Sequence, residues 1–266
     1  MEKPTAKSVN MAAREILNKN HLSFLNVSLI CIASAIFVAA FCDLIHLVAP
    51  NTASIFLQGI CLLVFGIFFV TPLGLGLIRF FWKSSYSESA VFTDFLYYFS
   101  SRIRYFRAVR FSLIFIFRVG TIAFFCYLPL IIVSLLNVSW IYMLFETTPP
   151  VWAAGLTYVF GYLNFFCSLI FIFSVLKLYL SPVLIVTDDN MTSLEALHIS
   201  SLLSADFLPS FVKLLFRNLI YFLLNIFIVP AIYTVPHLTT CYIVHAKAVF
   251  DCHNAKMRSV PENLYY

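Results

Sequence analysis

The chain has 266 residues, of which 62% are hydrophobic, 18% aromatic and only 11% charged, and its formal net charge is +5. Soluble proteins average about 45–50% apolar and about 25% charged residues, so this composition excludes an ordinary soluble domain. A bilayer, which accepts outward-facing apolar side chains, accommodates it. The basic residues lie in short clusters between apolar runs, as membrane orientation requires, so we expect no nucleic-acid partner. The sequence predicts an all-α, polytopic helical bundle that forms one integral membrane domain, residues 1–266.

The first element, residues 1–20, is polar but carries apolar residues at helical spacing. Val9, Ala12, Ala13, Ile16 and Leu17 fall on one face of a helix. This spacing predicts an amphipathic helix on the cytoplasmic side. It either lies on the membrane surface or simply leads into the first span.

Six apolar segments come next along the chain. A membrane-spanning helix needs about 20 residues, and each segment is close to this length or longer. They are residues 22–41, 53–81, 109–136, 152–180 and 211–229, and a weaker segment at about 236–250. Pro72 lies inside the long second segment, and proline cannot donate a backbone hydrogen bond within a helix. We therefore expect a kink or a tilt there.

Lys and Arg are distributed asymmetrically between the predicted loops. The intervals 42–52, 137–151 and 230–236 contain no Lys or Arg. Basic loops stay in the cytoplasm, so both termini are predicted to be cytoplasmic in a multi-pass protein of the plasma membrane. Six spans also keep the tail, residues 254–266, inside together with its Lys256 and Arg258.

A cytoplasmic segment at 83–108 is expected to lie at the membrane interface. Its aromatic residues Phe92, Phe95 and Phe99 share a helical face, and three arginines follow, Arg102, Arg104 and Arg107. Aromatic rings and arginines at headgroup level are typical of interfacial helices. The segment serves either as an ordinary anchor or as a specific lipid site.

A second cytoplasmic helix, an elbow at 188–208, is predicted between spans four and five. Pro182 ends or kinks the fourth span, and Thr192 with Glu195 fits a capping box at the start of a new helix. Asp189 lies just upstream, where negative charge favours the positive end of a helix. Small hydroxyl residues share one stripe of this helix: Ser193, Ser200 and Ser204. Such residues allow close packing against a span.

Three cations are candidate contacts for an anionic lipid headgroup: Arg118, Arg217 and Lys177. If the third span begins at Val109, Arg118 lies about 13 Å into the membrane, near its midplane. A charge at that depth costs about 2.5–3.5 kcal/mol unless it snorkels or finds a partner. Arg118 therefore snorkels to lipid phosphates, forms a buried ion pair, or shares an anion site with the other two.

The sequence carries no recognisable catalytic signature. It lacks the HExxH, GxSxG and Walker patterns, and its seven cysteines have no metal-ligand spacing. Asp188-Asp189 resembles the aspartate pairs that hold magnesium diphosphate in membrane prenyltransferases, but the second acidic motif that those enzymes need is absent. We expect no catalytic residue, no metal and no cofactor. The predicted role is a non-enzymatic membrane component that contacts anionic lipids, or an accessory or scaffold protein with a membrane protein partner or a second copy. The alternative is a small transporter or exporter of an amphiphile.

The order of these features resembles a known family. The likeness lies in Ala13 and Leu17, the aromatic segment 92–99, Pro129, Asp189, residues 193–197, Ser200 and Pro236. Together they resemble a family of bacterial integral membrane proteins, mostly Gram-positive, known only as a domain of unknown function. The resemblance covers nearly the whole chain and implies six spans and a bacterial plasma membrane. A more distant likeness to the membrane domain of glycerophosphodiester phosphodiesterases implies a lipid-related role.

Overall fold

The structure, a computed structural model, describes residues 4–19, 21–48, 52–85, 92–136, 152–225 and 227–259. All regular elements in these ranges are helical, which confirms the predicted all-α class. In chain order they are α1 (Ala6–Lys19), α2 (His21–Val48), α3 (Thr52–Phe65), η1 (Gly66–Val70), α4 (Thr71–Ser85), α5 (Phe92–Phe95), η2 (Tyr97–Phe99), α6 (Arg102–Leu136), α8 (Trp152–Leu176), α9 (Ser181–Thr187), α10 (Ser193–Arg217), α11 (Leu219–Leu224) and α12 (Ile228–Ser259).

Five stretches of these helices are long and apolar enough to cross a membrane. They are Ser23–Phe41, Leu57–Ser85, Arg102–Ile131, Val159–Thr187 and Ser193–Arg217. The chain is therefore a multi-pass membrane protein. The first four correspond to predicted spans, whereas the fifth does not.

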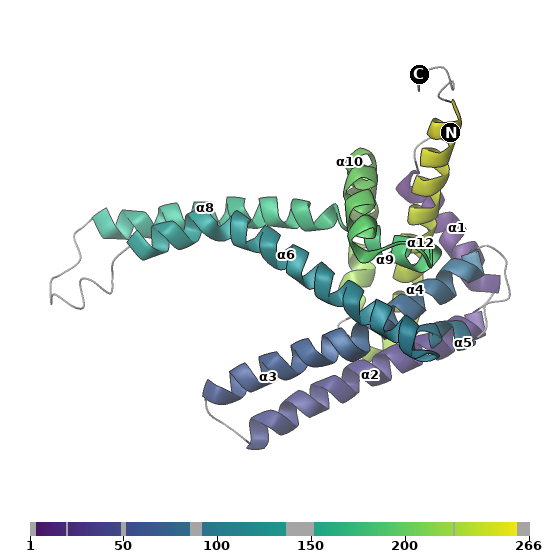
Figure 1. Cartoon of the computed structure of the whole chain (residues 1–266), viewed down its shortest axis with the longest axis horizontal. Helices are drawn as coiled ribbons and strands as arrows, with labels where there is room; N and C mark the ends of the chain where they lie inside the picture. The colour runs from purple at the N-terminus through teal and green to yellow at the C-terminus, as the bar shows by residue number, and fades with distance from the viewer. Residues whose placement is uncertain are drawn as a thin grey trace.

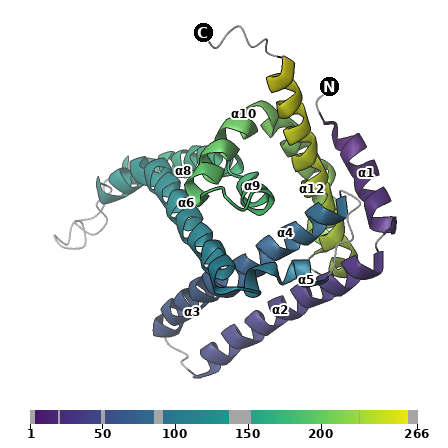
Figure 2. The same cartoon turned by 45° about the vertical axis from the view of Figure 1, so that its right-hand side comes forward.

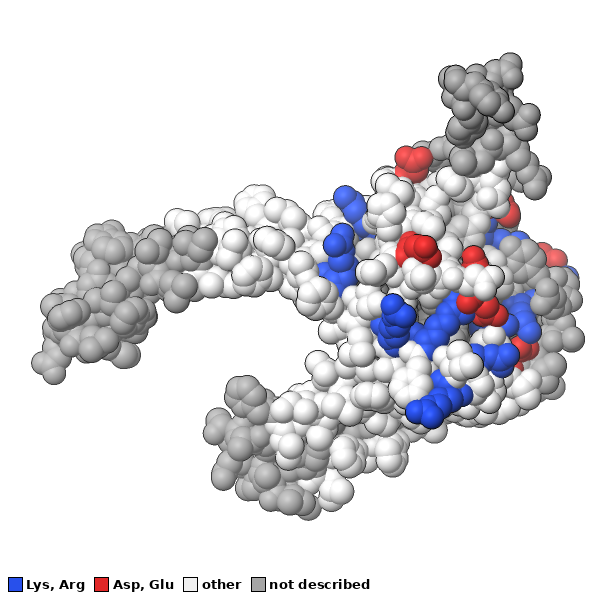
Figure 3. All heavy atoms as spheres, viewed as in Figure 1, with Lys and Arg blue, Asp and Glu red and all other residues white. Residues whose placement is uncertain are grey.

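Two helical hairpins, α2–α3 and α6–α8, project as arms from a base to the same side of the molecule (Figure 1). Large apolar side chains are exposed along both arms, among them Ile60, Leu63, Phe117 and Phe125. Charged side chains gather on the base in Figure 3, and the visible described surface of the arms beyond their roots shows few charges; one charged residue, Asp43, lies near the far end of α2. This separation places the arms in lipid, where exposed apolar surface costs nothing.

The short helix α9 lies in the middle of the base, surrounded by α4, α6, α10 and α12 (Figure 2). Its side chains Val183, Ile185 and Val186 are buried, and they belong to one core with Phe80 of α4 and Ile243 of α12. The polar elbow region is thus anchored by an apolar helix that the surrounding helices enclose.

Where a kink or a tilt was expected at Pro72, the helix contains a π-helical turn, η1, which ends at Val70, two residues before the proline. Pro72 has no amide to donate to the carbonyl of Phe68, four residues back. The Tyr105 hydroxyl of α6 donates to that carbonyl instead, at 2.9 Å. Thr71 bonds the Gly66 carbonyl through its amide, and through its hydroxyl at 3.0 Å. The interruption of the second span is therefore bridged by a side chain from the third.

The elbow helix is longer than predicted. It was expected to end at residue 208, but α10 continues through Pro209 to Arg217 as one helix of 25 residues. Proline removes one helical hydrogen bond, yet Phe207 and Phe211 on either side are buried and hold both halves in place. Core packing here overrides the local signal that separated the elbow from the fifth span.

The last two predicted spans are consequently divided differently. Residues 211–229 fall in the end of α10, in α11 and in the start of α12, with a break at Asn218. The predicted sixth span lies within α12, which is not among the candidate spans of the described chain. The predicted tail is helical to Ser259, and its remainder lies outside the described residues.

Two predicted surface elements contribute to the core instead. The apolar face of α1 packs on α10 and α12, where Val9 and Ala13 are buried against Leu214 and Cys241. In the interfacial segment, Phe92 and Phe99 are exposed as expected, whereas Phe95 is fully buried. The apolar face of α1 and Phe95 of the interfacial segment therefore pack against protein.

Candidate functional site

The helix of the fourth span is interrupted by a turn between α8, which ends at Leu176, and α9, which begins at Ser181. This break leaves the Lys177 carbonyl without a helical donor. Ser200 and Ser204 of α10 donate their hydroxyls to it at 3.1 and 2.7 Å, and the Leu180 amide donates to Ser200 Oγ at 3.1 Å. The serine stripe, buried as predicted, therefore also satisfies the broken end of the fourth span.

The predicted capping box is confirmed at the start of α10. Thr192 Oγ1 accepts a hydrogen bond from the Glu195 amide at 3.3 Å, and Glu195 Oε2 accepts one from the Thr192 amide at 2.9 Å. The preceding Asp188 Oδ1 accepts from the Asn190 amide at 2.8 Å, which forms the turn into this helix. These local hydrogen bonds thus determine where α10 begins.

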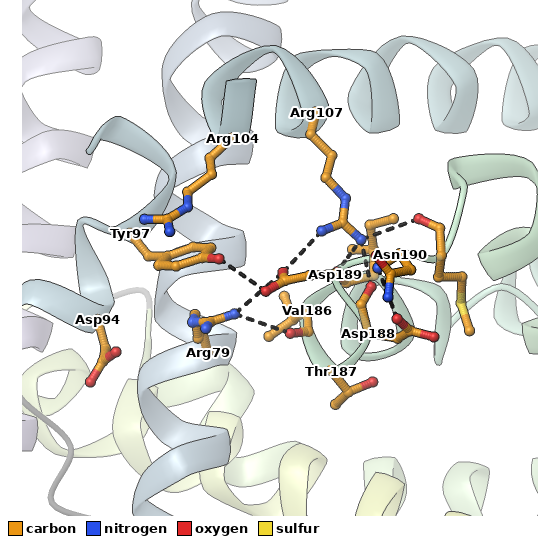
Figure 4. A network of polar contacts seen from close by, with 12 residues as sticks. Arg79, Asp94, Tyr97, Arg104, Arg107, Val186, Thr187, Asp188, Asp189 and Asn190 are labelled. Atoms are coloured by element: carbon orange, nitrogen blue, oxygen red, sulfur yellow. Dashed lines mark hydrogen bonds and ion pairs between the residues drawn. The ribbon is translucent and has the colours of Figure 1, made fainter. Parts of the chain in front are cut away.

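Asp189, placed upstream of the helix by the sequence, binds two arginines from other elements (Figure 4). Arg107 of α6 donates to Asp189 Oδ1 at 3.0 Å, and Arg79 of α4 lies 3.7 Å from the same oxygen. The second Arg107 nitrogen donates to three elbow carbonyls, those of Ile185, Asp188 and Met191. Asp189 therefore ties α9 to the second and third spans, beyond any role at a helix end.

Tyr97 of η2 completes this cluster. Its hydroxyl donates to Asp189 Oδ2 at 3.1 Å. Arg79 lies over its ring at 3.6 Å from the centroid and Arg104 at 4.1 Å, on opposite sides in Figure 4. Cations attract an aromatic face, so the ring holds two like charges apart while the carboxylate balances one of them. We call Arg79, Tyr97, Arg107 and Asp189 the elbow clasp.

An apolar cavity of about 830 Å³ lies beneath the elbow. Its walls come from α3, η1 and α4 on one side, from α6 on another, and from α9 to α12 behind. Representative lining residues are Gly74, Ile78, Phe115 and Pro182. Thr71 and Ser112 also line it, but their hydroxyls bond each other at 2.9 Å. The walls therefore offer mainly apolar contact.

The three predicted headgroup contacts have different surroundings. Arg118 is exposed on α6 and forms no ion pair within the described chain. The Lys177 side chain is also exposed, beside the elbow break. Arg217 lines a separate pocket with Lys7 and Arg14 of α1, and neither Arg118 nor Lys177 lines that pocket. The sequence grouped Arg217 with Arg118 and Lys177, whereas the structure places it beside the cations of α1.

The sequence did not predict that the two clasp arginines pair with Asp189: it placed Arg107 in the interfacial segment at 83–108 and gave Arg79 no partner. Arg79 and Arg107 belong to spans two and three, and no spacing rule connects them with an aspartate more than 80 residues away. One signal was present, since each arginine lies within an apolar helix end, where a charge needs a partner. Asp189 is the acidic residue that the fold brings there.

The fold and these sites define a multi-pass helical membrane protein with an apolar cavity, the elbow clasp and a second pocket lined by Lys7, Arg14 and Arg217. Comparison of the chain with known protein families, curated proteins and solved structures finds no match.

Proposed function

We propose that this protein is a non-enzymatic, lipid-interacting membrane component that holds the acyl chain of a membrane lipid or similar amphiphile in the apolar cavity. The observation that carries the proposal is the cavity itself, whose about 830 Å³ lies within the about 300–1,000 Å³ typical of ligand sites. Its apolar lining matches an alkyl chain, because burial of apolar surface is the main source of affinity for such ligands.

The two arms supply a route by which such a chain reaches the cavity. The lining includes Leu63 and Gly66 from one arm and Phe115 and Ile116 from the other. The space between the arms is open in Figure 3. Because the arms carry apolar surface suited to lipid, an acyl chain enters laterally without crossing water.

Filling the cavity tests this proposal. Gly74 lines it, and a Cβ at this position would meet no atom within 4 Å. We expect Gly74→Phe to occupy the cavity without disturbing the fold. Lipid retained after exhaustive detergent exchange, measured by native mass spectrometry, is expected to be stoichiometric in the wild-type protein and lost in the variant.

Gly120→Phe is the matched control. Gly120 also has open space around its Cβ but does not line the cavity, so the same residue is added to a membrane-facing helix. Its lipid content is expected to equal that of the wild type. Equal loss in both variants, or no retained lipid in the wild-type protein, would refute acyl-chain binding.

Transport of the amphiphile is the second candidate, favoured by two interrupted spans at this cavity. The π-helical turn η1 lines it directly, and Pro182, after the break in the fourth span, lines it too. Interrupted helices around a central site are typical of transporters. Lipid flux measured in proteoliposomes separates the candidates, because a binding component retains lipid without moving it.

A further inference from the structure

A second pocket, of about 360 Å³, lies between α1 and the junction of α10 with α11. It is lined by Lys7, Asn10, Met11, Arg14, Arg217, Ile220 and Tyr221. The first four recur at positions i, i+3, i+4 and i+7 of α1 and therefore form one stripe of that helix. We call this site the basic pocket. It combines three cations from two elements far apart in the sequence.

The basic pocket is held in shape by a part-buried polar contact. Asn10 and Asn218 exchange two amide hydrogen bonds, each 3.2 Å long, and Cys241 donates its thiol to Asn10 Oδ1 at 3.1 Å. At the rim, Arg14 donates to the Tyr221 hydroxyl at 3.4 Å. These bonds fix α1 against the α10–α11 junction and thereby set the positions of the cations.

Among the described residues, the walls of this pocket carry no counter-charge to its positive charge. None of the residues that line it carries a carboxylate, and Lys7, Arg14 and Arg217 form no ion pair within the described chain. The three cations are exposed and line one pocket, so they repel one another through solvent that screens part of the repulsion. A bound anion would relieve this repulsion, and a planar guanidinium is suited to two parallel hydrogen bonds with a phosphate.

The surroundings of the pocket indicate an amphiphilic anion. Met11 and Ile220 line it with 57% and 69% of their surface exposed, so apolar contact is available beside the cations. Asn218, the partner of Asn10, lines the apolar cavity on the other side of the same helical turn. The basic pocket and the cavity thus share a wall.

We propose that the basic pocket binds the phosphate group of an anionic ligand, with Arg14 and Arg217 as its forked donors and Lys7 as a point charge. The ligand that fits both neighbouring sites is an anionic phospholipid. That choice of source rests on the proposed function, whereas the phosphate site itself does not.

The test uses full-length protein in detergent and titrates it with phosphatidylglycerol, with phosphatidylcholine and, in a separate arm, with inorganic phosphate. Native mass spectrometry reports the lipid arms, and calorimetry reports the phosphate arm. We expect Arg14→Gln and Arg217→Gln each to weaken phosphatidylglycerol binding about tenfold, the loss typical of one strong charge-assisted contact. Arg217→Lys keeps the charge and is expected to recover part of the affinity.

Lys213→Gln and Arg110→Gln are the matched controls, because each removes one exposed cation that does not line the pocket. Melting temperature is measured on every variant, so that loss of fold is not counted as loss of binding. Dependence of inorganic phosphate binding on the pocket cations supports the site and assigns a soluble ligand. Equal weakening by the controls, or binding in neither arm, overturns the proposal. Gly74→Phe separates the two proposals, since it fills the cavity, excludes the acyl chain and leaves the residues of the basic pocket unchanged.

Discussion

At the scale of single residues, Arg107 makes more polar contacts with the segment 185–191 than Asp189 makes with its two arginines. Its guanidinium reaches Asp189 and three backbone carbonyls, and its side chain is 20% exposed, whereas that of Asp189 is 53% exposed. The bonds to the Ile185 and Met191 carbonyls are part-buried, whereas the Asp188 carbonyl also accepts from the Met191 amide. Loss of a charged donor to part-buried carbonyls costs more than loss of a half-exposed ion pair.

The two sides of the clasp should therefore respond unequally to substitution. We expect Arg107→Gln to lower the free energy of unfolding by about 2–3 kcal/mol, because the part-buried carbonyls of Ile185 and Met191 lose a charged donor and Asp189 loses its nearest cation. Asp189→Asn should cost about 1 kcal/mol or less, because the pair is partly screened by solvent. Thermal melting in detergent measures both. A larger loss for Asp189→Asn would show that the charge dominates the clasp.

Tyr98, next to the clasp, is fully buried, and among the described residues its hydroxyl has no hydrogen-bond partner. Burial raises the pKa of this phenol from 10.0 to about 12, while Arg107 and Arg79 act in the opposite direction. The folded state therefore favours the neutral phenol. Its contribution to stability is complete below pH 10 and is lost as the pH rises through about 12.

Tyr98→Phe should separate these two effects. At neutral pH we expect the variant to be as stable as the wild type or more stable by about 1 kcal/mol, since an unsatisfied buried hydroxyl is removed. Between pH 10 and pH 12 the wild-type protein should lose about 2–3 kcal/mol relative to the variant. Melting temperatures of both proteins across this range provide the measurement. A variant less stable at neutral pH would mean that the hydroxyl does have a partner.

At the scale of elements, close contact of backbones positions the second span. Gly76 of α4 is buried, and a Cβ there would lie 1.9 Å from the carbonyl oxygen of Phe95 in α5. Lys83 of the same helix binds Asp94 at 2.7 Å. A glycine and an ion pair thus dock the short helix α5, which leads through η2 to Tyr97 and the clasp.

Gly76→Ala should consequently destabilise the protein although alanine is the better helix former. The added methyl group must push α5 away, which we expect to cost about 1–3 kcal/mol, as overpacking usually does. Gly74→Ala, two residues earlier in open space, should be neutral or stabilising by up to about 1 kcal/mol. The two melting curves are compared under identical conditions. Equal behaviour would show that α5 is not docked at Gly76.

Local signals predicted the elements that local chemistry determines. The Thr192–Glu195 capping box, the break before Pro182 and the interruption at Pro72 were readable because each depends on a few neighbouring residues. The continuation of α10 through Pro209 was not, because it depends on Phe207 and Phe211 being buried by distant helices. The clasp and the basic pocket were missed for the same reason, since their members meet only in the folded chain.

At the scale of the whole molecule, the arms and the base have different surroundings. The arms expose apolar side chains such as Phe117, 78% exposed, whereas charged residues gather on the base (Figure 3). Composition and run length were sufficient to predict a multi-pass membrane protein, although they did not predict the two projecting arms. They were insufficient for the number of crossings, because α12 carries polar residues such as His237 and His245, both buried in the fold. Whether α12 crosses the bilayer decides on which side the chain ends.

Reporter fusions after positions 50, 145 and 260 test this topology. The Lys/Arg asymmetry predicts the first two on the outer side and the third in the cytoplasm, because basic loops resist export. Five crossings with a cytoplasmic start would place position 260 outside, together with the nearby Lys256 and Arg258. We therefore expect a cytoplasmic signal at 260, which requires α12, or α11 with the start of α12, to complete a sixth crossing. An external signal there would show that α10 is the last crossing. It would also place the end of α12 on the side opposite α1, in conflict with the packing of α1 on α12.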